Sequence, residues 1–182
     1  FLKSTPTPWL HVLAHIIPYD IRRNYVTKRI WDKFQNSPNM YSITQDMANL
    51  PPFRLKSRKP LWKEEFLMQP FSKSDYWKAA WQEVDIFNKN LIEDPTKQLP
   101  GFDLPRKIWC KLNRFRTGHG KCNNMLFHWN IRENPSCECG AEKETIQHIV
   151  EECPLTKFQQ GFSKLHLLTE DALNWLQQIK NI

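Results

Sequence analysis

The sequence predicts a mainly α protein, an irregular helical assembly with a small cysteine-containing module near its C-terminus. Apolar residues recur three and four positions apart through most of the chain, which is the spacing of one helical face. The alternation of apolar and polar residues that marks a half-buried strand is scarce. The 13 prolines interrupt the helical patterns often, so we expect short helices joined by irregular segments.

Changes in composition divide the chain into five segments. We expect a helical segment at 1–50, a proline-rich basic linker or arm at 51–73, a basic helical region at 74–132, a cysteine-containing module at 133–158 and a C-terminal helix at 159–182. The boundaries fall where prolines cluster or the charge changes sign, and helices end readily at such prolines.

Two helices are expected in the first segment. Pro8 suits the first turn of a helix, and Pro18 ends that helix. A second helix is expected from Asp20 to about residue 34, with Ile30 and Phe34 turned inward.

The linker and the helix after it are marked by different signals. Residues 51–73 contain four prolines and no sustained periodicity, which indicates a linker or an arm on a surface. Ser72 and Asp75 have the spacing of a capping box, and Trp77 and Trp81 begin the apolar stripe of the helix that follows.

A basic helix is expected to begin near Pro105. Apolar residues lie on one of its faces, and Lys or Arg residues lie at the same spacing on the adjacent face. The apolar set is Ile108, Leu112 and Phe115, and the basic set is Lys107, Lys111 and Arg114. Gly118 and Gly120 then permit a sharp loop before a helix at about 121–130. Thr169 is expected to cap the last helix.

The net charge of +7 and the pI near 9.2 make nucleic acid or another anionic surface a plausible partner. Residues 101–132 hold seven Lys or Arg against one Asp, whereas 133–154 hold six Glu against one Lys. The positive charge therefore adjoins the cysteine-containing module without belonging to it. Mean hydropathy is −0.63 and no apolar run reaches about 18 residues, so no membrane partner is expected.

The module at 133–158 has the ligands of a metal site. Cys137, Cys139, His148 and Cys153 make a Cys₃His set, which is a closed tetrahedral ligand list for one structural zinc ion. His148 and Cys153 are five positions apart, so an unbroken helix would turn them about 140° away from each other. Pro154 disfavours helical geometry at Cys153, which lets the thiolate turn back. The alternative is a set of free thiols beside a packed histidine.

The remaining titratable residues do not suggest catalysis. A catalytic zinc keeps one open coordination position, but four good ligands leave none. His119 and His128 lie near Cys110 and Cys122 in the sequence, yet they form no second ligand set.

Five cysteines cannot all pair, and their clustering favours a reducing compartment, so we expect an intracellular protein of the nucleus or cytoplasm, or both.

The chain resembles a known family. The most specific motifs of this resemblance are the stretches "LNRFRTGHG" and "CECGAEKETIQHIVEECP", and the sequence around them adds to it. The chain is similar to the region downstream of the polymerase domain in jockey-like non-LTR retrotransposon reverse transcriptases. The resemblance implies a parent RNA-directed DNA polymerase that copies its RNA at a nicked chromosomal target. Polymerases of this type need an Asp-Asp pair for magnesium, and none occurs here, so the chain by itself is not expected to be an enzyme.

We therefore expect an accessory region that binds template RNA or target DNA, next to the polymerase domain of the same parent chain and without a small-molecule substrate. The candidate phosphate-binding surface consists of Arg106, Lys107, Lys111, Arg114, Arg116 and Lys121. Phe127 and Trp129 are candidates for stacking on a base, although both also suit a core. The alternative function is a zinc-stapled docking or folding module, such as a fragment reused by a host, that does not bind nucleic acid.

Overall fold

A computed structural model describes residues 4–49 and 65–179. The chain divides into two compact units, each of which is described by itself. The larger unit comprises Phe1–Ile16 and Glu83–Ile182, and the smaller unit comprises Ile17–Gln82. Every regular element in the described ranges is a helix, which confirms the mainly α prediction for them. Residues 4–16 thus group with the C-terminal part of the chain.

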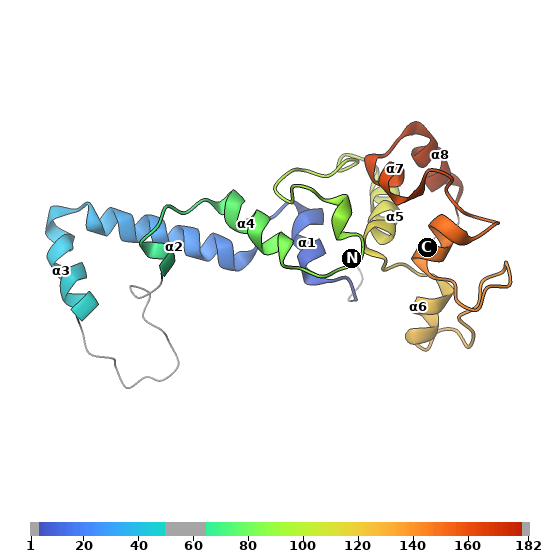
Figure 1. The fold of residues 1–182 in the computed structure, drawn as a ribbon, viewed down its shortest axis with the longest axis horizontal. Coiled ribbons are helices and arrows are strands. Elements are labelled where there is room, and N and C mark those ends of the chain that lie inside the picture. Colours follow the sequence, from blue (N-terminus) through green and yellow to red (C-terminus); the bar gives the residue numbers. More distant parts are fainter. Residues whose placement is uncertain (1–3, 50–64, 180–182) are drawn as a thin grey trace. The chain divides into compact units, whose positions relative to one another are not determined.

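The smaller unit is built around one long helix. Its elements are α2 (Tyr19–Gln35), α3 (Pro38–Asn49), the 3₁₀ helix η2 (Glu65–Leu67) and α4 (Lys73–Gln82). Helices α3 and α4 both contact α2 (Figure 1). The Ser72 hydroxyl accepts a hydrogen bond from the Asp75 N–H (3.3 Å), so the predicted cap at the start of α4 is confirmed.

The exposure of apolar residues in the C-terminal half of α2 differs from the prediction. Ile30 and Phe34 are 45% and 37% exposed, so the prediction that both turn inward is wrong among the described residues. Helical spacing identifies an apolar face but not what packs against it. Most of the expected linker at 51–73 lies outside the described residues.

The larger unit carries the cysteine-containing module and most of the core. Its elements are α1 (Thr7–Ala14), the 3₁₀ helix η3 (Lys89–Leu91), α5 (Arg106–Thr117), α6 (Asn123–His128), the π-helical turn η4 (His148–Glu152), α7 (Gly161–Leu167) and α8 (Glu170–Gln178). Pro105 precedes α5, and Gly118 ends it with φ +71°, a conformation in which glycine avoids steric strain. Thr169 caps α8 by accepting from the Ala172 N–H (3.3 Å), as predicted.

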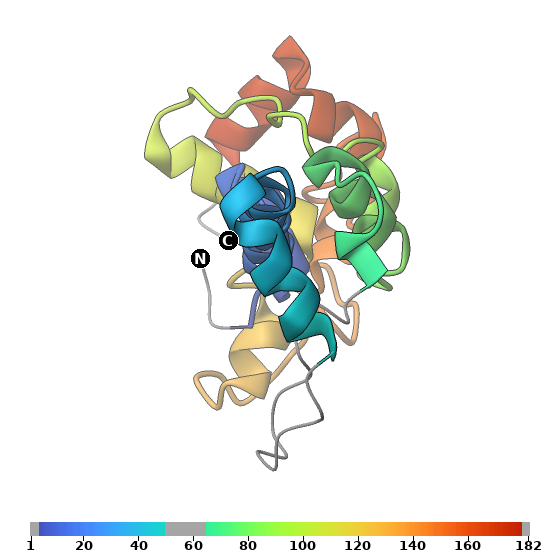
Figure 2. The same ribbon diagram turned by 90° about the vertical axis from the view of Figure 1, so that its left-hand side faces the viewer.

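Helix α5 is the centre of this unit. It contacts α7 and α8 directly, and two views at right angles place α6 at the opposite end of the unit from α7 and α8 (Figures 1 and 2). Leu112 and Phe115 have no exposed surface, which agrees with the predicted apolar face. They belong to one cluster with buried residues of η4, α7 and α8, including Val150, Leu165 and Leu176. No helix in the described ranges is both long enough and apolar enough to cross a lipid bilayer.

Candidate metal centre and the groove beside it

The first two cysteines of the candidate metal centre lie in a tight turn. The Cys137 N–H donates to the Ala141 carbonyl (2.9 Å), and the Gly140 N–H donates to the Cys137 carbonyl (3.0 Å). Gly140 has φ +94°, a backbone conformation that is strained for any residue with a side chain. This turn needs only one residue between Cys137 and Cys139 to bring both thiols to the same cluster.

The other two candidate ligands come from the π-helical turn η4 and the residue after it. The Cys153 N–H donates to the His148 carbonyl (2.7 Å), so the hydrogen bond spans five residues instead of the four of an α-helix. This wider turn brings residues five apart closer to the same side. Cys153 itself is extended (φ −67°, ψ 119°), as expected for a residue before proline. Both features reduce the angular separation that an unbroken α-helix would impose.

The structure brings the four predicted ligands together. Their ligand atoms all lie within 4.8 Å of one another, so this cluster could hold a metal ion. The Sγ atoms of Cys137 and Cys153 are 3.8 Å apart, and Cys139 Sγ lies 3.2 Å from His148 Nε2. A tetrahedral zinc ion with bonds of about 2.3 Å separates two sulfurs by roughly 3.8 Å, so the geometry is compatible with one zinc. All five cysteines are free thiols.

Neighbouring groups orient these ligands. His148 Nδ1 lies 3.3 Å from the Glu152 carboxylate, which places the proton on Nδ1 and leaves Nε2 free to act as a ligand. Burial raises the pKa of the Cys137 thiol. Burial also acts against ionisation of Cys153, but hydrogen bonds from the Thr156 side chain and the Leu155 backbone lower its pKa below the ordinary value. Metal binding would therefore displace a proton from Cys137.

Two of the six residues predicted to form a phosphate-binding surface are in the interior. Lys111 is only 6% exposed, and its Nζ donates to the carbonyls of Leu176 (2.9 Å) and Ile179 (2.7 Å). Both carbonyls lie at the C-terminal end of α8, where helix carbonyls lack partners and carry the negative end of the helix dipole. The Lys111 ammonium thus caps α8, and the expected surface placement of this residue is wrong.

Arg116 has the same role for α7. It is 1% exposed, and its Nη2 donates to the carbonyls of Pro100 (2.8 Å) and His166 (3.0 Å), the second of which lies in the last turn of α7. Its Nε donates to His166 Nδ1 (3.2 Å), and its Nη1 donates to Asn113 Oδ1 (3.0 Å). The guanidinium also lies 5.3 Å from the ring centroid of Trp109. The expectation that Arg116 lies on the phosphate-binding surface is also wrong, because all these contacts are internal.

Burial lowers the pKa of two members of this network, Arg116 and His166. Burial lowers the pKa of Arg116 to about 9, so the guanidinium is still charged at neutral pH. Burial and the adjacent Arg116 charge lower the pKa of His166 to about 4. His166 is therefore neutral at pH 7, and its Nδ1 can accept the hydrogen bond from Arg116.

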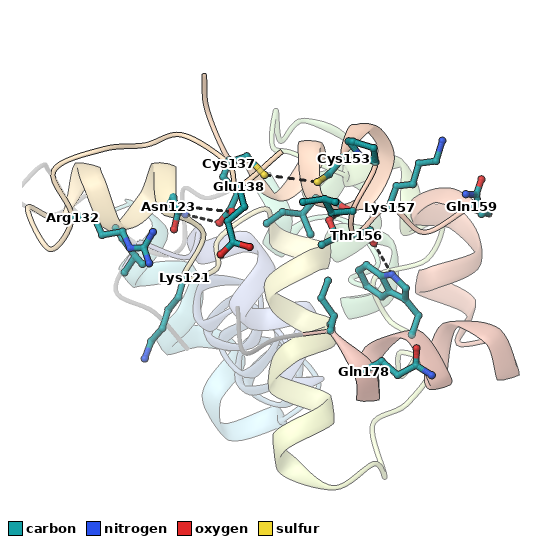
Figure 3. A pocket seen from close by; sticks show the side chains of 17 residues that line it. Lys121, Asn123, Arg132, Cys137, Glu138, Cys153, Thr156, Lys157, Gln159 and Gln178 are labelled. Carbon is teal, nitrogen blue, oxygen red and sulfur yellow. Dashed lines mark hydrogen bonds between the residues drawn. The ribbon is translucent and has the colours of Figure 1, made fainter. Parts of the chain in front are cut away.

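Beside the candidate metal centre lies a groove of about 620 Å³. Cys137 and Cys153 lie at one end of it, and three basic side chains, Lys121, Arg132 and Lys157, line it (Figure 3). Lys121 precedes α6 in the chain and Arg132 follows it, whereas Lys157 lies across the groove from them (Figure 3).

Glu138 and Glu144 also line the groove, but Glu144 has a structural role there. Its carboxylate accepts from the backbone N–H of Asn123 (2.9 Å) and from the Asn123 side chain (3.3 Å), at the start of α6. Sequence reasoning identified Lys121 but missed Arg132 and Lys157 as neighbours. Only their proximity to the ends of the cysteine-containing module could have indicated them.

The remaining predicted residues lie elsewhere. Arg106 and Arg114 line a second, smaller cavity along α5, and Lys107 is exposed but lines neither cavity. Phe127 is 40% exposed, and Trp129 is half-buried. Within the described ranges, no second group of three or more potential metal ligands occurs.

Comparisons with known proteins give partial similarity to retrotransposon polyproteins. An 86-residue part of the chain is 44% identical to the Retrovirus-related Pol polyprotein from type-1 retrotransposable element R1 of Bradysia coprophila, covering 44% of this chain and 8% of that protein. A 39-residue part is 44% identical to the Retrovirus-related Pol polyprotein from type-1 retrotransposable element R1 3 of Nasonia vitripennis, covering 21% of this chain and 10% of that protein. No family model and no solved structure matches. The chain is thus related in part to non-LTR retrotransposon proteins, and the matched parts span about a tenth or less of each relative.

Proposed function

We propose that this chain is the accessory nucleic-acid-binding region of a non-LTR retrotransposon reverse transcriptase. It would lie downstream of the polymerase domain in a jockey-like parent and position template RNA or target DNA for target-primed reverse transcription. The observation that carries the proposal is the groove, because Lys121, Arg132 and Lys157 line it from different parts of the chain. Basic side chains along a groove can contact a phosphate backbone without reading its sequence.

One structural zinc ion at Cys137, Cys139, His148 and Cys153 fits this role. The four ligands leave no open position for catalysis. When bound, the ion would fix the turn at Cys137 against the segment at Cys153, and both residues line the groove. The exposed surface of the module carries Glu138, Glu142 and Glu151, so the basic wall beside it is the better phosphate contact.

The polymerase chemistry would belong to the parent protein. This chain has no Asp-Asp pair to hold the magnesium ions of a polymerase. Its partners would be RNA or DNA and the polymerase domain of the same parent, inside the cell in the nucleus or cytoplasm.

A second candidate function is docking on another part of the polyprotein. Val26, Ile30 and Phe34 recur every four positions along α2 and are 41%, 45% and 37% exposed among the described residues. Side chains at this spacing share one helical face. A protein-docking module would use this face and would bind nucleic acid weakly at physiological salt.

Salt-dependent binding separates the two functions. Fluorescence anisotropy with labelled single-stranded RNA and duplex DNA, measured from 50 to 300 mM salt, gives the slope of log affinity against log salt. Replacing Lys121, Arg132 and Lys157 by Gln should reduce the slope by about 2 on a single strand and by nearly 3 on duplex DNA. The control is the matched replacement of three exposed lysines that line neither cavity, namely Lys97, Lys143 and Lys164. Equal effects of the two triple variants, or no binding by the wild type, would reject the groove.

A further inference from the structure

A second cavity lies along α5, apart from the groove. It has a volume of about 330 Å³, and no residue lines both spaces. Arg106, Trp109, Asn113 and Arg114 of α5 line it, together with Thr5 and His119. We refer to it as the α5 cavity. Pockets that accept small organic molecules begin at about this size, which exceeds that of a single phosphate ion.

Asn113, which lines the cavity, carries a hydrogen-bond donor without an acceptor among the described residues. Asn113 is 3% exposed, and its Oδ1 accepts a hydrogen bond from Arg116 Nη1 (3.0 Å). That bond fixes the orientation of the amide, because a guanidinium can only donate. The Nδ2 group is then buried and has no acceptor among the described residues. Nearly all buried polar groups are hydrogen-bonded, so this unpaired donor, on a residue that lines the cavity, calls for an acceptor that a ligand could supply.

The charge of the cavity wall indicates the chemistry of this ligand. Arg106 and Arg114 are eight positions apart on α5, about two turns, and both line the cavity. No Asp or Glu of the described ranges lines it. Two guanidinium groups and an amide donor form a set suited to phosphate and carbonyl oxygens.

Two further side chains suit an organic part of the ligand. The Arg116 guanidinium lies 5.3 Å from the centroid of the Trp109 ring, and the Phe102 ring packs against it edge-on at a centroid distance of 5.5 Å. These two contacts position the indole in the cavity wall. His119 Nδ1 lies 2.7 Å from the Thr117 carbonyl, which fixes the proton on Nδ1 in the neutral ring. A fixed aromatic ring beside a basic group is the combination that single-stranded nucleic-acid sites use.

We infer that the α5 cavity binds one nucleotide of an unpaired nucleic-acid strand. Arg106 and Arg114 contact its phosphate, Asn113 Nδ2 donates to one of its oxygen atoms, and Trp109 contacts its apolar part. The inference rests on the proposed function and adds to it a second contact point, apart from the groove. It also gives Asn113 a role as a donor that Arg116 holds in position.

The test uses Asn113→Asp in the full chain. This change keeps the acceptor for Arg116 but replaces the donor Nδ2 by an oxygen that repels phosphate. Binding of a labelled 12-nucleotide single-stranded RNA of mixed sequence should weaken at least about tenfold, the size expected for losing a charge-assisted hydrogen bond. Asn174→Asp makes the same chemical change at an exposed position of α8 that lines neither cavity, and it should weaken binding less than about twofold. Circular dichroism and thermal unfolding establish that both variants fold.

The outcomes separate this inference from the proposed function. If the wild type binds the strand and Asn113→Asp binds it equally well, the α5 cavity is refuted and the groove stands. If the wild type binds duplex DNA but no single strand, the α5 cavity is likewise refuted. If it binds neither single-stranded RNA nor duplex DNA at any salt concentration, the proposed function itself fails. Nuclear magnetic resonance of the Asn113 side-chain amide gives a further measure, since the strand should shift this signal. An equal shift with inorganic phosphate alone would refute the nucleotide in favour of a simple anion site.

Discussion

Replacing Lys111 by Met should destabilise the larger unit, because Lys111 caps α8 from the interior. The ammonium donates to the carbonyls of Leu176 and Ile179, and hydrogen bonds from charged groups contribute about 1.5–3 kcal/mol each. Burial lowers the pKa of Lys111, with smaller contributions from Lys107 and Arg114, so the charged form bears a desolvation cost that methionine removes. The net loss in the free energy of unfolding should be about 2–4 kcal/mol.

Urea unfolding, followed by tryptophan fluorescence at pH 7 with zinc present, measures this loss by linear extrapolation. Lys107→Met is the matched control, because Lys107 is exposed one turn earlier on the same helix. An exposed substitution of this kind should change the free energy of unfolding by less than about 0.5 kcal/mol. If the two variants unfold at the same urea concentration, the capping role of Lys111 is refuted. A loss of nucleic-acid affinity in folded Lys111→Met beyond that of Lys107→Met would restore its surface role.

Three further predictions follow from the same unit. Arg116→Lys should lose about 2–3 kcal/mol in urea unfolding, since one ammonium cannot reach acceptors on Asn113, Pro100 and His166 together. His166 has a pKa near 4 in the folded chain and about 6.5 when unfolded, so stability should fall as pH drops through this window, by at most about 3.4 kcal/mol. Subtracting the pH profile of His166→Gln isolates this effect, and identical profiles would contradict it. Cys139→Ser should lower the zinc content from the proposed one ion per chain, measured by elemental analysis. Cys110→Ser, outside the cluster, should retain that ion.

Local features of the chain were predictable because they depend on near neighbours in sequence. Ser72 caps α4 and Thr169 caps α8 through hydrogen bonds to residues three positions ahead. Pro154 holds Cys153 extended, because a residue before proline avoids helical geometry whatever surrounds it. The spacing of the four candidate ligands similarly led to a cluster that the structure brings within 4.8 Å.

The roles of the basic residues were decided by tertiary structure. Lys107, Lys111 and Arg114 look alike in sequence, but only Lys111 meets the end of α8, so it is buried while Lys107 is exposed. Arg116 likewise meets the last turn of α7, 50 positions away. Helical periodicity gives the side of a helix on which a residue lies, but it does not give the element that packs there.

The sequence by itself therefore determined the helical class, several helix ends and the ligand set of the candidate metal centre. Tertiary structure decided which cations cap helices and which line cavities. It also brought Lys157 opposite Lys121 in the groove, and it left Asn113 Nδ2 buried without an acceptor among the described residues. The physical reason is that caps and turns depend on a few adjacent residues, whereas burial of a charge depends on partners supplied by distant segments.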